Sequence, residues 1–405
     1  MNSTQRPSVC WLGGTRYTRP LNPTQDAKWR ALAELCAAMY VIGFSATLRP
    51  RRFTQGATFY LLPELPSSFL RYIEIFLIAP VLIFWLVFRH RVQVIVTQSP
   101  IDGAIGGWLK QIAALLGRRV VLIVENHGDF EVSVFTQRQV MFARLYRWLI
   151  RRCAQYAFQQ ADALRAISSM TRRQAQHFAP DKPIEQFMTW TDADVFLNTP
   201  REIPIAKSQD IVYAGILIPR KGVHFLIDAF VQIAVEFPDA RLWLVGKPEN
   251  MSYAAQLRRQ VERAGLGARV TFVGAVQQQE LAHYMGRGRV FVLPSISEGL
   301  GRVIVEAMLC GTPAIGSQVD GIPDLIHDQE NGYLVPVGDV EALVAALRRV
   351  YNDPNIDAMG ERARAFARQF FSTEAYVEGY RRLIDSALNP SPLPSVALPV
   401  HGEGE

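Results

Sequence analysis

At 405 residues and 49% hydrophobic composition, the chain is long enough for two domains of about 150 to 200 residues, each with its own core. Its four scattered cysteines (Cys10, Cys36, Cys153, Cys310) show neither a C-x-x-C pair nor metal-ligand spacing. This pattern suits a reducing cytosol. The net charge is +6, but basic residues outnumber acidic ones only in residues 1–205, which predicts an anionic partner for the first half, either a membrane surface or nucleic acid.

The first elements read as a strand, a loop and a helix. Residues 1–10 hold one arginine and no apolar core, so no signal peptide is predicted. An apolar run at residues 8–12 is followed by Gly13-Gly14 and then by a helical pattern that reaches Leu35. This order predicts a glycine loop at a strand end, although an ordinary tight turn explains the glycine pair as well. The next strands are predicted at residues 39–44 and 57–62.

Residues 75–88 are wholly apolar and are flanked by Arg71 and Arg89. A membrane span needs about 20 residues, and Glu74 and Pro80 also argue against crossing a bilayer. Two interpretations stay open. The segment is either a buried core helix or a monotopic helix that dips into the membrane interface.

A strand at residues 92–96, a helix at 102–116 and a buried strand at 119–124 follow. His127 and Asp129 follow the last of these strands and so lie at its carboxyl end, where open α/β sheets bind ligands. A histidine at such a position is also typical of an ordinary core or loop.

Residues 138–159 are predicted as an amphipathic helix. Arg144, Arg147 and Arg151 fall at i, i+3 and i+7 and so share one face. That face fits either an anionic lipid surface or plain solvent. A strand at residues 161–168 and a further helix complete the first half.

The polar, proline-marked segment at residues 196–209 is predicted as the domain linker. The second half then alternates strands and helices, which predicts a parallel, doubly wound sheet. Strands are predicted at residues 211–215, 241–245, 270–273 and 290–293, and helices at 223–235, 254–264, 279–285, 341–351, 356–371 and 373–388. The tail from Asn389 is predicted to be disordered.

The central motif runs from Pro294 to Pro313 and joins a buried strand to a helix that begins near Val303. Glycines at such a turn let the backbone approach a ligand, and the N–H groups and positive end of the new helix favour a diphosphate. Glu298 lies in the loop and Glu306 in the helix, so their directions differ by about 80° and both can face one pocket. There they would accept hydrogen bonds from sugar or ribose hydroxyls, although a helix-stabilising acid beside an exposed glutamate is the simpler explanation.

A second strand-to-helix turn, at residues 215–222, carries the adjacent cations Arg220 and Lys221. Arginine can grip a diphosphate bidentately and lysine acts as a point charge, and both would stabilise the charge on a departing nucleoside diphosphate. A basic surface pair is the alternative.

The two glutamates, with seven residues between them, resemble the donor-site signature of the family 4 retaining glycosyltransferases, which are nucleotide-sugar enzymes of GT-B architecture. The resemblance continues through Val319-Asp320-Gly321-Ile322-Pro323 and Glu330-Asn331-Gly332-Tyr333, and covers most of residues 205–350. Three positions depart from the family pattern. Ile216 replaces an arginine, Gly128 replaces an aspartate after the histidine, and Asp320 replaces one glycine of a pair.

The resemblance implies an α/β fold of two Rossmann-like, doubly wound domains that face each other across a cleft. Residues 1–197 would bind the acceptor and residues 198–372 the nucleotide-sugar. Residues 373–388 would form a helix that packs back on the first domain, and residues 389–405 a disordered tail.

The resemblance also implies roles for site residues. Glu306 would bind the ribose, Glu298 the sugar, and Arg220 and Lys221 the diphosphate, with Arg220 in place of the missing arginine. His127 would lie close to the transferring sugar and Gly14 across from the diphosphate. Further backbone contacts to the donor would come from Gly299, Leu300, Gly301 and Val303. None of the motifs that carry the resemblance is a metal-binding Asp-x-Asp, so neither a metal nor a cofactor besides the donor is expected.

The resemblance implies a retaining glycosyltransferase. Together with the features above, it predicts a metal-independent enzyme that moves a sugar from a UDP- or GDP-sugar to a lipid-linked glycan or glycolipid in cell-envelope or polysaccharide synthesis. We expect it to be cytoplasmic and peripheral at the inner face of the plasma membrane, bound to an anionic membrane surface. No motif supports a nucleic-acid partner. A non-catalytic subunit that binds nucleotide-sugar, and a GT-B epimerase or phosphorylase, stay open as alternatives.

Overall fold

The computed structural model describes residues 6–128 and 143–389, and the chain divides into two compact units. The first unit comprises the chain up to Met188 together with the segment from Tyr376 onward, and the second runs from Thr189 to Ala375. The second unit is therefore inserted, along the chain, into the first.

The polar segment at residues 196–209, predicted as the domain linker, belongs instead to the second unit. Arg201 of this segment donates from Nη1 to the Thr312 hydroxyl at 2.9 Å and from Nη2 to the Gly288 carbonyl at 2.6 Å. Polar composition alone cannot distinguish a linker from a surface loop bonded to its own domain. The first boundary lies at Met188, earlier than the predicted residue 197.

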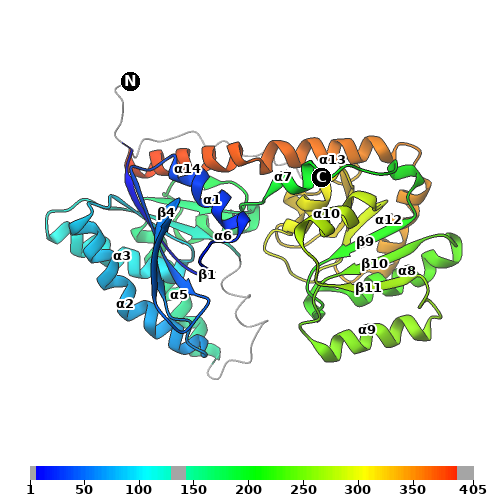
Figure 1. Cartoon of the computed structure of the whole chain (residues 1–405), viewed down its shortest axis with the longest axis horizontal. Helices are drawn as coiled ribbons and strands as arrows, with labels where there is room; N and C mark the ends of the chain where they lie inside the picture. Colours follow the sequence, from blue (N-terminus) through cyan, green and yellow to red (C-terminus); the bar gives the residue numbers. More distant parts are fainter. Residues whose placement is uncertain (1–5, 129–142, 390–405) are drawn as a thin grey trace. The chain divides into compact units, whose positions relative to one another are not determined.

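The first unit is built on a mostly parallel sheet (Figure 1). Its described strands follow the order β3-β4-β2-β1-β5-β6-β7-β8. They are β1 (Ser8–Tyr17), β2 (Ala38–Ser45), β3 (Arg51–Gln55), β4 (Ala57–Leu62), β5 (Val94–Thr97), β6 (Val121–Asn126), β7 (Ala163–Ala166) and β8 (Ile184–Gln186). All neighbouring pairs are parallel except β3 with β4. Strand β3 was not predicted, because Phe53 is the one buried side chain of this edge strand and a single apolar residue gives no alternating pattern.

The predicted glycine loop after residue 12 is wrong, because β1 continues through Gly13 and Gly14. The pairing of β1 with β2 shifts register between Leu12 and Arg16, so the glycines form an irregularity inside the strand. A Cβ on Gly13 would lie 2.1 Å from Oε1 of Gln98, whereas one on Gly14 would meet nothing within 4 Å. Of the two glycines, only Gly13 is therefore required by the close contact with the Gln98 side chain.

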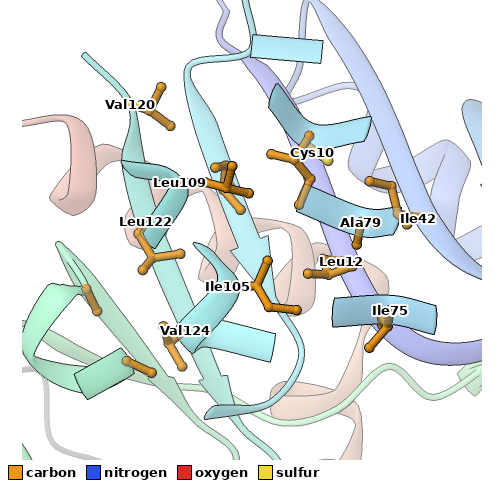
Figure 2. Close-up of a cluster of buried hydrophobic side chains, with 14 of the residues drawn as sticks. Cys10, Leu12, Ile42, Ile75, Ala79, Ile105, Leu109, Val120, Leu122 and Val124 are labelled. Atoms are coloured by element: carbon orange, nitrogen blue, oxygen red, sulfur yellow. The ribbon is translucent and has the colours of Figure 1, made fainter. Parts of the chain in front are cut away.

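The helices of the first unit are α1 (Pro23–Ala33), α2 (Ser68–Arg89), α3 (Pro100–Leu115), α5 (Ala143–Gln160), α6 (Ser169–Phe178) and, from Tyr376 onward, α14 (Thr373–Leu388). Helices α2 and α3 contribute to an apolar core together with strands of the sheet (Figure 2). Ile75, Ala79 and Ile83 of α2 lie in this core, whereas Leu77 and Val81 of the same helix are 68% and 69% exposed. One face of residues 75–88 is thus core, and the opposite face is apolar and exposed.

The second unit contains a parallel sheet in the order β11-β10-β9-β12-β13-β14 (Figure 1). Its strands are β9 (Asp210–Ala214), β10 (Arg241–Val245), β11 (Val270–Gly274), β12 (Val290–Leu293), β13 (Ala314–Ser317) and β14 (Gly332–Val335). Its helices are α7 (Ala193–Leu197), α8 (Val223–Glu236), α9 (Met251–Arg263), α10 (Gln278–Arg287), α11 (Arg302–Leu309), α12 (Val340–Asn352) and α13 (Ile356–Phe371). The strand order reverses between β9 and β12, and open α/β sheets bind ligands at the carboxyl ends of such a pair.

Candidate functional site

The candidate site of the second unit lies at the carboxyl ends of β9 and β12. After β9, the turn Pro219–Lys221 leads into α8, and after β12 residues 294–301 lead into α11. Gly222 has a φ of 64°, and a Cβ there would lie 1.9 Å from the Pro294 carbonyl oxygen. Only glycine fits this contact, so the two turns touch through their backbones.

Hydrogen bonds tie these two turns together. The Ile296 amide donates to the Arg220 carbonyl at 2.8 Å, and Arg220 Nη1 donates to the Ser297 carbonyl at 2.6 Å. Among the described residues, the buried Nε of Arg220 has no hydrogen-bond partner. Arg220 therefore shapes the loop that follows β12, and its contact with a diphosphate stays a prediction.

Lys221 and Glu298 form an ion pair at the centre of the site. The ammonium and the carboxylate are in direct contact, and the two side chains are 12% and 14% exposed. The Ser295 hydroxyl donates to the same carboxylate at 3.4 Å. A lysine held in this way is a point charge of defined position, which suits the binding of a phosphate group.

Asp320, shortly after β13, holds the Glu298 loop in place. One oxygen of its carboxylate accepts from the Glu298 amide at 2.7 Å and from the Ser297 hydroxyl at 2.8 Å. Its φ of 51° lies in the left-handed region, which aspartate enters more readily than most residues. The residue that replaces a family glycine is thus an anchor of the candidate site.

The N-terminus of α11 follows the loop directly. Gly301 has a φ of 88° and precedes the helix, and no side chain caps the first turn. The first N–H groups of such a helix and its dipole favour a bound anion. Gly299 and Val303 are partly exposed, whereas Leu300 is buried, so the predicted ligand contacts of this loop would come from its backbone.

Glu306 lies one turn into α11 and is 4% exposed. Arg302 Nε lies 3.2 Å from Glu306 Oε1, and the Arg302 side chain is 57% exposed. Burial raises the pKa of Glu306, and the Arg302 charge opposes that rise only in part. A buried carboxyl group of this kind would gain from hydroxyl donors such as those of a ribose.

In the first unit, His127 follows β6, and its Nε2 lies 2.5 Å from Oε2 of Glu125. The imidazole is 37% exposed and Glu125 only 1%. The same carboxylate accepts from Arg165 Nη1 at 3.2 Å and from the Tyr380 hydroxyl. Burial alone would raise the pKa of Glu125, but Arg165, His127 and Tyr380 together lower it to about 2.

The residues predicted from the sequence thus fall into two groups, one in each unit. The second unit brings Arg220, Lys221 and Glu298 together. In the first unit, β5 separates the strand that carries Gly14 from the strand that precedes His127. Asp129, the alternative to His127, lies outside the described residues. In the ranges 6–128 and 143–389, no group of three or more His, Cys, Asp or Glu side chains could hold a metal ion.

Four residues with close contacts to the predicted site were missed. Asp320 was noted only as a departure from the family pattern, and that departure was the one available signal. Glu125 lies two residues before His127 in an apolar strand. A carboxylate in such a strand indicates that its charge is paired. Arg165 gave the same signal, since it is a charge in the apolar strand β7. Tyr380 gave none, because its contact to Glu125 joins segments that are distant in the chain.

Comparison with known proteins identifies relatives of both halves. Residues 198–369 match the model of the family described as glycosyl transferases group 1. The chain is 27% identical over 303 residues to the N-acetyl-alpha-D-glucosaminyl L-malate synthase of Bacillus anthracis, and this match covers 73% of this chain and 75% of that protein.

A second relative is the GDP-mannose-dependent alpha-(1-6)-phosphatidylinositol monomannoside mannosyltransferase of Mycolicibacterium smegmatis. It is 29% identical over 223 residues, which cover 51% of this chain and 58% of that protein. Among solved structures, Anabaena HepE in complex with UDP is similar with a TM-score of 0.72 at 18% identity, over 94% of this chain and 100% of that chain. This similarity shows the fold, which is GT-B.

Proposed function

We propose that this chain, whose residues 198–369 match the family of glycosyl transferases group 1, transfers a sugar from a UDP- or GDP-sugar to an acceptor, with retention of the anomeric configuration. The UDP bound to HepE and the GDP-mannose dependence of the mycobacterial relative support a nucleotide-sugar donor.

The observation that carries this proposal is the meeting of Lys221, Glu298 and the N-terminus of α11 at the switch point of the second sheet. The lysine charge and the first N–H groups of α11 would bind the diphosphate. Glu298 would accept from the sugar and Glu306 from the ribose. The same cation and helix dipole would stabilise the charge that develops as the nucleoside diphosphate leaves, so we propose that no divalent metal is required.

Binding and turnover of defined donors test this proposal. We expect a UDP- or GDP-sugar to raise the melting temperature equally in Mg²⁺ and in EDTA, and slow hydrolysis or transfer to follow. NMR of the product, recorded before it equilibrates, should show the anomer of the donor. Donor binding without any turnover would indicate a non-catalytic subunit, and no shift with any nucleotide-sugar would contradict the proposal.

We further propose that the acceptor is membrane-associated and that the first unit lies on the membrane. The mycobacterial relative is named for a phosphatidylinositol monomannoside. In this chain, most of the exposed large apolar side chains of the described residues lie on or next to three helices of the first unit. They are Leu70, Ile73, Phe76, Leu77, Ile78, Val81, Phe84 and Trp85 of α2, Trp108 and Leu115 of α3 with Leu116 directly after it, and Leu145, Trp148 and Leu149 of α5.

These helices form one side of the first unit, because α3 contacts both α2 and α5 (Figure 1). Large exposed apolar patches mark interaction sites. Arg144, Arg147 and Arg151 are exposed on α5, and each basic side chain near an anionic leaflet contributes about 1 kcal/mol. In the described part of the chain, no helix is long and apolar enough to cross a membrane. We therefore propose a peripheral protein on the cytoplasmic face, held by these three helices.

A further inference from the structure

Glu125 is a buried, ionised residue that the function proposed above does not use. It lies at the end of β6, and its carboxylate receives donors from three other positions. Oε2 contacts His127 Nε2 at 2.5 Å and Arg165 Nη1 at 3.2 Å, and Oε1 accepts from the Tyr380 hydroxyl of α14. A buried carboxylate is stable only with such partners, so the site is built around its charge.

Arg165 supplies the counter-charge and is itself 1% exposed. Its Nη2 donates to the Met188 carbonyl at 2.7 Å, and its Nη1 donates to the Tyr380 hydroxyl at 3.1 Å. Its guanidinium lies 4.2 Å from the ring of Phe187 and 5.5 Å from that of Tyr376. Met188 and Tyr376 are the last residue before the second unit and the first residue after it. The two residues at which the chain leaves and re-enters the first unit therefore both contact Arg165, which in turn binds Glu125.

We propose that Glu125 is a positioning residue that holds His127 as the Nε2–H tautomer, and that α14 supports this through Tyr380. An ionised carboxylate can only accept hydrogen bonds, so the Nε2 atom that contacts it must carry the proton. The Nδ1 atom of the neutral ring is then left as an acceptor, and a histidine in this state can receive a proton or a hydrogen bond from a hydroxyl group. Only this last step, the use of Nδ1 in sugar transfer, rests on the proposed function.

The tautomer can be measured directly in the full chain. Protein labelled with ¹⁵N-histidine gives ring-nitrogen shifts for its seven histidines, and His127→Ala identifies the signals of interest. For the neutral ring of the wild type, we expect Nε2 to carry the proton and Nδ1 to be unprotonated. In Glu125→Gln and in Tyr380→Phe, both tautomers should be populated, more evenly in the former.

Two tyrosine variants of α14 support this test. Tyr380→Phe removes one hydroxyl and leaves the Glu125–Arg165 pair in place, so it stays informative if Glu125→Gln fails to fold. Tyr376→Phe, one turn earlier on α14, keeps the ring beside Arg165 and should leave the His127 signals unchanged. A wild-type ring protonated on Nδ1, or a tautomer ratio that Glu125→Gln does not alter, would overturn the proposal.

A kinetic measurement then separates this inference from the proposed function. With an active donor, Glu125→Gln should lower kcat about tenfold and leave the donor KM unchanged, as expected when an interaction acts in the transition state. If the tautomer shifts but no sugar donor is turned over by the wild type, the positioning role stands and the proposed function fails. If the donor is turned over and the tautomer does not shift, the positioning role fails alone.

Discussion

At the scale of single residues, Glu306 and Glu298 should affect different steps. Glu306→Gln should weaken binding of the donor by roughly tenfold to a hundredfold, because losing a hydrogen bond from a buried carboxylate costs about 1.5 to 3 kcal/mol. Glu298→Ala should mainly slow transfer, since it leaves Lys221 without its ionic partner. Calorimetry with the donor and initial rates at saturating donor measure the two effects.

A suitable control is Glu262→Gln, which alters an exposed glutamate of α9. It should bind and turn over the donor like the wild type. If both site variants also behave like the wild type, residues 294–306 are not the donor site.

Asp102, buried in the first turn of α3, should make the stability of the first unit depend on pH. Burial raises the pKa of its carboxyl group from 3.8 to about 6, and the Ser99 hydroxyl opposes this rise. The folded state binds the proton more tightly, so the stabilisation by this group is complete below about pH 4 and is lost as the pH rises through about 6. A shift of about two units corresponds to about 3 kcal/mol.

Asp102→Asn keeps an acceptor for Ser99 and cannot ionise. Its free energy of unfolding should exceed that of the wild type by up to about 3 kcal/mol at pH 7.5, and the difference should shrink towards pH 4. Denaturant unfolding of the first unit at several pH values measures this. The exposed Asp181 provides the control substitution, and a difference that is constant with pH would contradict the argument.

At the scale of elements, α2 and α5 should bind membranes through separable contributions. Salt screens the arginines of α5 but does not weaken burial of the apolar side chains of α2. High salt should therefore release only part of the protein from anionic liposomes. Replacing Phe84 and Trp85, which are 39% and 41% exposed, with serine should make the remainder extractable by salt, as flotation assays can measure.

The matched control replaces Val235 and Met251 of the second unit, which are 81% and 71% exposed, with serine. This variant should float like the wild type, and circular dichroism must show that both double variants are folded. Wild-type protein that ignores liposomes of every composition would exclude the proposed membrane surface.

The helices and strands also show how much of the fold and of the site can be predicted from the sequence. Helix α13 and strand β12 have the predicted bounds, because long amphipathic patterns and short apolar runs are local signals. Lys221 and Glu298 could be assigned to one site, since both follow strands of a parallel sheet. The Asp320 anchor and the Tyr380 contact could not be predicted, because they depend on which distant turns and helices meet.

At the scale of the whole molecule, the first unit should need α14 to be stable. Four large side chains of this helix, Tyr376, Tyr380, Leu383 and Ile384, are buried. At about 1.5 to 3 kcal/mol each they contribute roughly 6 to 12 kcal/mol, which approaches the whole stability of an ordinary domain. Ending the chain at Ser372 should therefore unfold the first unit and leave the second unit folded.

Hydrogen exchange read by mass spectrometry measures this. Peptides from β6 and β7 should lose protection while those from β9 and β12 keep it. A chain that ends at Asn389 retains α14 and serves as the control, with protection expected to match the full chain. Protected β6 peptides in the shorter chain would show that α14 is dispensable.

The insertion of the second unit into the first also has a consequence for synthesis. A ribosome completes the second unit before it releases the segment from Tyr376 onward. At 5 to 20 residues per second, this delay lasts roughly 10 to 40 s. Throughout it, the nascent Glu125 and Arg165 lack the tyrosine that covers them, and apolar positions that α14 will fill stay open to solvent and to chaperones. The part of the protein that is translated first is therefore the last to be completed.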